Sequence, residues 1–143
     1  MRAATQDELQ FGLMGFINSC VASERRARFC GFVHSAKGLG KWVEQLDHFQ
    51  RYLDISLATS VASFATPADL IASFRLPAAS DVLVVSTLKG MQGVVMSLEC
   101  AIEETYKMGN GSILCSLSAT PTFWFYLGEE AHAQYLFLQG KQL

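Results

Sequence analysis

Residues 34–42, HSAKGLGKW, combine the residue types that can hold an anion. Glycines permit a tight backbone curve, and backbone N–H groups at the start of a helix attract negative charge, to which nearby lysines add. Histidine and serine side chains can donate further hydrogen bonds. The candidate ligand-binding residues are His34, Ser35, Lys37, Gly38, Gly40 and Lys41. A ligand site at this segment would therefore take an anionic metabolite.

The same segment departs from the established phosphate-binding motifs. In the pattern GxxxxGK[ST], Ser35 stands in place of the first glycine, and Trp42 replaces the hydroxyl residue that would bind magnesium. The dinucleotide-binding pattern needs a third glycine beside Gly38 and Gly40. We therefore favour an ordinary connection between a strand and a helix, in which Trp42 points into the core and anion binding is weak.

Other residues that carry chemistry form no complete site in the sequence. Glu130 and His132 would share one face of a strand and could join His34 in a metal or acid–base site, yet His34 is distant in the chain. The four cysteines are Cys20, Cys30, Cys100 and Cys115. They form no CxxC pair, so we expect reduced, mostly buried and unreactive thiols. The sequence identifies no catalytic residue and predicts neither a metal site nor a cofactor.

A basic patch is a further alternative. SERRARF (23–29), together with Lys37 and Lys41, places five basic residues in a short span, and FWFYL (123–127) supplies aromatic rings. Exposed rings beside such a patch would suit single-stranded nucleic acid. The net charge of −2 disfavours this interpretation, and we expect the rings to fill the core.

Length and composition set the class of protein. The chain has 143 residues, half of them apolar and 17% charged, which suits one globular domain over residues 1–143. No apolar run approaches the roughly 18–20 residues of a membrane span. Asp7 and Glu8 fall where a signal peptide would be apolar. We therefore expect a cytoplasmic protein.

Helices are predicted wherever apolar residues recur at a spacing of three or four. These segments are 6–22, 40–54, 66–74 and 96–108. Either Thr5 or Asp7 is a suitable N-terminal cap for the first helix, as are Thr66 and Ser97 for two later ones, and Pro67 fits a first helical position.

Strands are predicted from runs of aromatic and β-branched residues. They cover 28–35, 81–87, 112–118, 122–128 and 131–139. The run 81–87 is apolar throughout, which is typical of a central strand. Residues 88–93 have the character of a turn, and 55–65 fit either a strand or a helix.

This order of elements predicts an α+β domain. We expect a two-layer sandwich in which a mixed, mostly antiparallel sheet of five to six strands carries helices chiefly on one face. The last strand ends almost at residue 143, so we expect its edge to be uncovered and open to pairing.

Two functions follow from these expectations. The favoured one is an interaction module that binds a protein partner or itself, most simply as a homodimer. The alternative is a small enzyme or ligand-binding protein for an anionic metabolite at Gly38–Lys41. A pocket that gathers His34, Lys37 and Lys41 would support the alternative, whereas an apolar surface patch would support the interaction module.

Overall fold

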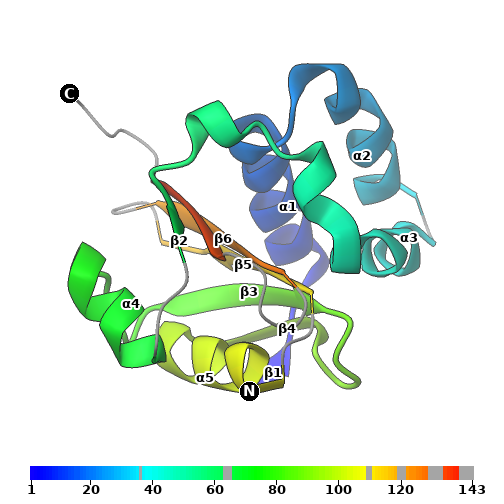
Figure 1. Ribbon diagram of the computed structural model, residues 1–143. Coiled ribbons are helices and arrows are strands. Elements are labelled where there is room, and N and C mark those ends of the chain that lie inside the picture. The colour runs from blue at the N-terminus through cyan, green and yellow to red at the C-terminus, as the bar shows by residue number, and fades with distance from the viewer. Residues whose placement is uncertain (36, 63–65, 109–110, 119–121, 129–133, 139–143) are drawn as a thin grey trace.

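The computed structural model describes residues 1–35, 37–62, 66–108, 111–118, 122–128 and 134–138. Within these residues the chain forms a seven-stranded sheet whose strands all pair antiparallel, and helices pack on both of its faces (Figure 1). The predicted α+β class, with a mostly antiparallel sheet and helices chiefly on one face, is therefore confirmed.

Five strands of five or six residues form the body of the sheet. They are β3 (Asp81–Ser86), β4 (Gln92–Ser97), β5 (Ser112–Ser116), β6 (Phe123–Leu127) and β7 (Gln134–Leu138). The short strands β1 (Arg2–Ala3) and β2 (Ser60–Ala62) complete it at its two ends. The order across the sheet is β1-β4-β3-β5-β6-β7-β2.

Strand β3 explains why the sheet is covered on both sides. Its residues alternate between two hydrophobic clusters, with Leu83 and Val85 in one and Val82 and Val84 in the other. Because successive strand residues point to opposite faces, a continuous apolar run needs apolar cover on each face. The prediction of a buried central strand over 81–87 is confirmed.

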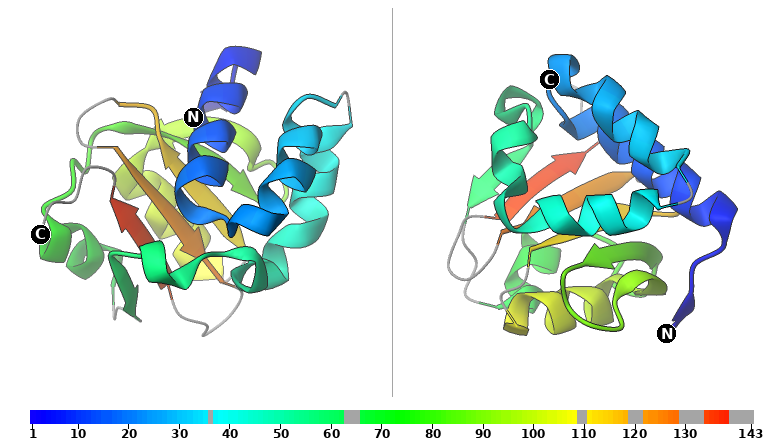
Figure 2. Two further views of the ribbon diagram at one scale, coloured as in Figure 1. Left: turned by 90° about the horizontal axis from the view of Figure 1, so that it is seen from above. Right: turned by 90° about the vertical axis from the view of Figure 1, so that its right-hand side faces the viewer.

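Most of the helices lie on the first face. They are α1 (Gln6–Cys20), α2 (Arg26–Val33) and α3 (Gly38–Gln45), with the 3₁₀ helices η1 (Ser23–Arg25), η2 (Leu46–Tyr52) and η3 (Ile55–Leu57). Both views of Figure 2 show α1 crossing the strands. The core of this layer is aromatic: the ring of Trp42 stacks on Phe49 at 5.5 Å and packs against Phe29 at 5.0 Å. The predicted burial of Trp42 is confirmed.

The other face carries α4 (Pro67–Phe74) and α5 (Leu98–Met108), which add helical cover to the predicted sandwich (Figure 1). Their apolar residues Leu70, Leu98 and Ile102 share a cluster with Phe123 and Phe125 of β6. The expected caps are present on this face: Thr66 Oγ1 accepts the N–H of Asp69 at 3.2 Å, and Ser97 Oγ accepts the N–H of Cys100 at 3.3 Å.

The strand predicted over 28–35 is wrong, because this segment is helix α2. Phe29 and Val33 are one helical turn apart and both are buried against the helical layer. Their spacing is therefore satisfied by a helix, and tertiary packing overrides the strand preference of aromatic and β-branched residues. The helix predicted over 40–54 is divided, since α3 passes into η2, in which His48 has the non-helical angles φ −122° and ψ 30°.

The turn predicted over 88–93 is shorter than expected. Residues 87–91 connect β3 to β4, and Gln92 already belongs to β4, a strand that the sequence did not reveal. Gly90 and Gly93 have positive φ angles of 82° and 101°, which glycine adopts without strain. The helix predicted from residue 96 consequently begins at Leu98.

The prediction that the last strand has an uncovered edge is also wrong. Strand β7 pairs with β6 on one side and with β2 on the other, in the register Ser60↔Leu136 and Val61↔Tyr135. The covering strand comes from residues 55–65, whose pattern fitted either a strand or a helix. The ends of the sheet are therefore β1 and β2, and β7 offers no open edge for a second copy.

Candidate functional site

The loop singled out in the sequence joins two helices, not a strand and a helix. Helix α2 ends at Val33 and α3 begins at Gly38. An added Cβ on Gly38 would lie 1.4 Å from the carbonyl oxygen of Phe32, so no other residue fits there without moving the backbone. A Cβ atom added to Gly40 would have no atom within 4 Å. Gly38 therefore serves the close approach of α2 and α3, and Gly40 has no such role.

The polar side chains of this loop are dispersed. His34, Ser35, Lys37 and Lys41 are all exposed. Ser35 Oγ accepts the backbone N–H of Lys37 at 3.3 Å, and Lys41 Nζ lies 5.6 Å from the ring centroid of Phe32. A pocket beside the loop is lined by Ser35, but His34, Lys37 and Lys41 are not among the described residues that line it. His34, Ser35 and Lys37 thus lie between α2 and α3, Lys41 lies in α3, and the structure does not gather these side chains into one pocket.

The other predicted constellations have different outcomes. Glu130 and His132 lie outside the described residues, so their relation to His34 stays a prediction. Among the residues that the structure covers, no group of three or more histidine, cysteine or acidic side chains could hold a metal ion. All five residues of β6 (Phe123–Leu127), including its four aromatic rings, are buried, as expected for core residues. The basic segment packs on Tyr52, whose ring lies 5.7 Å from the guanidinium of Arg25.

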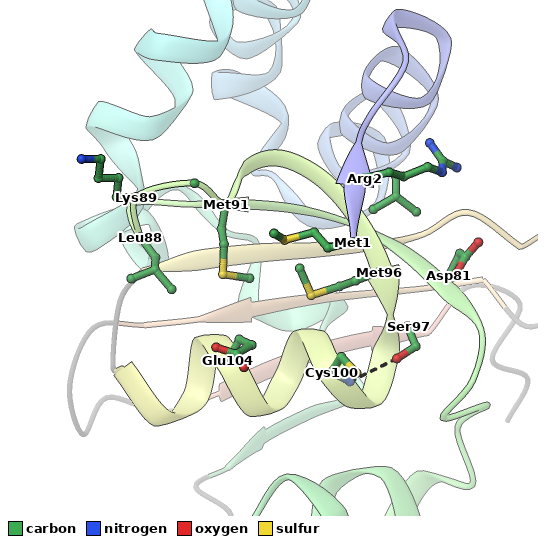
Figure 3. A pocket seen from close by; sticks show the side chains of 12 residues that line it. Met1, Arg2, Asp81, Leu88, Lys89, Met91, Met96, Ser97, Cys100 and Glu104 are labelled. Atoms are coloured by element: carbon green, nitrogen blue, oxygen red, sulfur yellow. Dashed lines mark hydrogen bonds between the residues drawn. The ribbon is translucent and has the colours of Figure 1, made fainter.

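A larger groove lies at the opposite end of the sheet from β2. It has a volume of about 1020 Å³ and is bounded by β1, the turn between β3 and β4, and the first turns of α5 (Figure 3). Met1, Met91 and Met96 lie together in its middle, as Figure 3 shows, and Leu88 lies at the turn. Met91 and Met96 are 5% and 8% exposed, whereas Met1 is 83% exposed. The floor of the groove is thus apolar and rich in methionine.

The rim of the groove carries charge of both signs. Its charged residues among those described are Arg2 and Lys89, which are cationic, and Asp81 and Glu104, which are anionic. All four side chains are exposed. A balanced rim attracts neither a strongly acidic nor a strongly basic ligand.

An ion pair fixes strand β1 in this site. Both terminal nitrogens of Arg2 donate to the carboxylate of Glu8 at 2.7 Å, and Thr5 and Glu8 form a reciprocal capping box at the start of α1. The hydrogen bond from Arg2, with that from the backbone N–H of Thr5, lowers the pKa of Glu8 from 4.5 to about 2. Because Arg2 directly follows Met1, the pair positions one wall of the groove.

The cysteines divide into two environments. Cys20 and Cys115 are buried, and burial raises the pKa of each thiol well above its ordinary value. Cys30 is half-buried on α2, not on the strand that was predicted for it. Cys100 is exposed and lines the groove, so its expected burial is wrong. Its neighbours Ala101 and Ile102 take the buried positions on α5, which turns residue 100 outward.

None of the predicted elements or motifs indicates this groove. Met91 and Met96 fall in a predicted turn and at the start of a predicted helix, and Met1 belongs to no predicted element. The available signal was the segment MQGVVMS, in which apolar residues flank a glycine and lead directly into a capped helix.

Comparison with family models, with curated proteins and with solved structures found no match to this chain. No helix in the described part of the chain is long and apolar enough to cross a membrane.

Proposed function

We propose that this protein is an interaction module, not an enzyme, and that the methionine-lined groove binds an extended apolar segment of a partner protein. The observation that carries the proposal is the groove itself, which combines an apolar floor, a charge-balanced rim and a volume of about 1020 Å³. That volume is at the upper end of the range of small-molecule sites, and the groove is long enough to border a strand, a turn and a helix.

Methionine suits this role chemically. Its unbranched, polarizable side chain adapts to different apolar partners, and methionine-rich surfaces recur where one site accepts several sequences. Met91 and Met96 supply a buried floor, and the exposed Met1 can close over an occupant. We expect the partner segment to present one or two large apolar side chains with balanced charge around them.

The adjacent sheet edge supports an extended conformation of the partner. Strand β1 stands at one end of the sheet and covers β4 only at Val94 and Val95. The backbone groups at an exposed sheet edge can accept a further strand, and pairing of this kind fixes a peptide while its side chains enter a neighbouring groove.

Self-association through the same groove is the second form of this proposal. Two cations and two anions on the rim let two copies face one another without net repulsion. Sedimentation over the micromolar range would show a dimer that dissociates in Leu88→Glu, and a monomer throughout would refute this form.

The anionic-metabolite site at Gly38–Lys41 has less support, because Lys37 at the start of α3 and Lys41 within α3 are both exposed to solvent and line no common pocket. A saturable thermal stabilisation by phosphate or a nucleotide, lost in Lys41→Ala, would restore the metabolite-binding hypothesis.

A cytoplasmic location also stays a prediction. The buried free thiols of Cys20 and Cys115 suit a reducing compartment.

Selection from a displayed library of random peptides tests the proposal. We expect enriched peptides with apolar anchors, whose binding is lost in Leu88→Glu, because a charge would enter the groove beside Met91. The matched control is Leu57→Glu, which alters an exposed leucine outside the groove and should bind as the wild type does. Failure to enrich any peptide, or equal binding by both variants, would contradict the proposal.

A further inference from the structure

We infer that an arginine patch on the first face of the domain, formed by Arg25, Arg28 and Arg51, binds an acidic segment of a partner protein. Arg25 ends η1, Arg28 lies in the first turn of α2, and Arg51 lies near the end of η2. Figure 1 shows α2 on the side of the sheet away from α4 and α5. None of the three arginines lines the methionine-lined groove, so the inference is independent of the proposed function.

The ring of Tyr52 holds the three guanidinium groups together. Their central carbon atoms lie 4.8 Å (Arg51), 5.7 Å (Arg25) and 5.9 Å (Arg28) from the centroid of this ring. A cation within about 6 Å of an aromatic centroid is attracted by the electrons of the ring. Three positive charges from three separate elements therefore converge on one part of the surface.

Tyr52 is a fixed support for these side chains. Its ring packs against Phe29 at 5.2 Å and Phe49 at 5.3 Å, and its hydroxyl donates to Gln45 Oε1 at 3.0 Å. Tyr52 itself is 6% exposed, whereas the arginines are exposed and carry their charge into solvent. Because they are already held against a ring, these side chains lose less conformational freedom when a ligand binds.

The charge of the patch is not neutralised by the described part of the chain. No carboxylate oxygen in it lies within 4.0 Å of a nitrogen of the three arginines, and their side chains donate no hydrogen bond to a described residue. Glu24 is exposed beside Arg25 in the chain and forms no such pair. Asp47, four residues before Arg51, accepts the N–H of Gly111 at 3.3 Å instead. Like charges gathered without a counter-ion favour a partner of opposite sign.

The form of the patch suits a polypeptide. Arg28 and Lys41 each lie 5.6 Å from the ring centroid of Phe32, so the row of cations continues from Tyr52 to a fourth charge on α3. The patch is an exposed surface, whereas small molecules are bound mainly by enclosure. Successive Asp or Glu side chains of a segment can contact this row, and each guanidinium can bind a carboxylate through two parallel hydrogen bonds.

Single-stranded nucleic acid fits the same surface less well. Its bases bind by stacking on exposed aromatic rings. Phe29 and Tyr52 are buried, and Phe32 is half-buried beside two cations. The net charge of −2 also provides no wide basic field along which a phosphate backbone could run. An acidic polypeptide needs neither feature, and the surface therefore favours it.

Hexaglutamate carrying a fluorophore is the probe for this inference, and labelled hexaglutamine is its uncharged control. At about 20 mM salt we expect saturable binding of hexaglutamate, which weakens as the salt rises to about 150 mM, and no binding of hexaglutamine. Arg28→Glu should lower the affinity about tenfold, because it puts an anion at the centre of the row. The matched control is Arg75→Glu, which makes the same change of charge at an exposed arginine after α4 and should alter the affinity by less than about twofold.

A second variant keeps the test decisive if Arg28→Glu fails to fold. Arg51→Gln removes one charge from a different element and should weaken binding about threefold. Absence of saturable binding up to about 1 mM protein, or equal losses in Arg28→Glu and Arg75→Glu, would overturn the inference. Tighter binding of hexauridylate than of hexaglutamate would also overturn it, since the patch would then be a nucleic-acid site. None of these results bears on the groove, which the peptide selection tests separately.

Discussion

A Cβ atom on Gly38 would stand 1.4 Å from the carbonyl oxygen of Phe32, so the two helices that carry these residues meet at a point where only glycine fits. Gly38→Ala should therefore destabilise the protein by about 3 kcal/mol, as severe overpacking does. Gly40→Ala is the matched control: it adds a methyl group in open space on the same helix, and should stabilise by about 0.5–1 kcal/mol. Urea unfolding of both variants measures the difference, and equal effects would contradict the model of this loop.

Trp42 and Lys41 are neighbours in sequence with opposite environments. Trp42→Ala should cost about 3–5 kcal/mol, because it empties the centre of the aromatic cluster. Lys41→Ala should change the free energy of unfolding by less than about 0.5 kcal/mol, since the side chain is exposed. Chemical denaturation tests both values, and a large loss in Lys41→Ala would show that the lysine has a structural partner beyond the ring of Phe32.

Acid should weaken the attachment of β1. Because the pKa of Glu8 is lowered from 4.5 to about 2, its stabilising contribution is present above pH 4.5 and is lost as the pH falls toward 2. Glu8→Gln lacks the charge that pairs with Arg2 but keeps an oxygen for the cap. We expect its urea midpoint to lie below that of the wild type at pH 7 and to converge with it by pH 2. A difference that stays constant over this range would show that the ion pair contributes nothing.

The four cysteines should react with a thiol reagent at rates that follow their burial. Cys100 should react rapidly with a thiol reagent under native conditions, Cys30 more slowly, and Cys20 and Cys115 only after unfolding. Mass spectrometry of the labelled peptides gives the four rates. Rapid labelling of Cys20 or Cys115 would contradict the packing of the first face, and protection of Cys100 by a bound peptide would mark occupation of the groove.

Local sequence patterns were sufficient to predict much of the fold. The buried run of β3, the hairpin strands β5 to β7, and the capped helices α1, α4 and α5 all carry periodicity or cap residues that act over a few positions. Helix α2 could not be assigned in this way, because Phe29 and Val33 suit both a strand and a helix until the layer beneath them is known. The same holds for β2, whose pairing with β7 links residues more than 70 positions apart.

The two sites differ in how they depend on the fold. The glycine-and-lysine loop was visible as a motif, yet the structure uses Gly38 for helix packing and leaves the lysines in solvent. The methionine-lined groove had no motif, since Met1 reaches Met91 and Met96 only because β1 joins the sheet beside β4. Sites assembled from distant segments depend on strand pairing, which composition and spacing do not specify.

The most direct test of the interaction-module proposal is a spectrum of the chain labelled with ¹³C at its methionine methyl groups, recorded with and without a peptide selected for binding. We expect the signals of Met91 and Met96 to move with saturation. The signal of Met14 on α1, on the opposite face of the sheet, should stay in place. Movement of Met14 while Met91 and Met96 remain unchanged would place the peptide elsewhere and contradict the account.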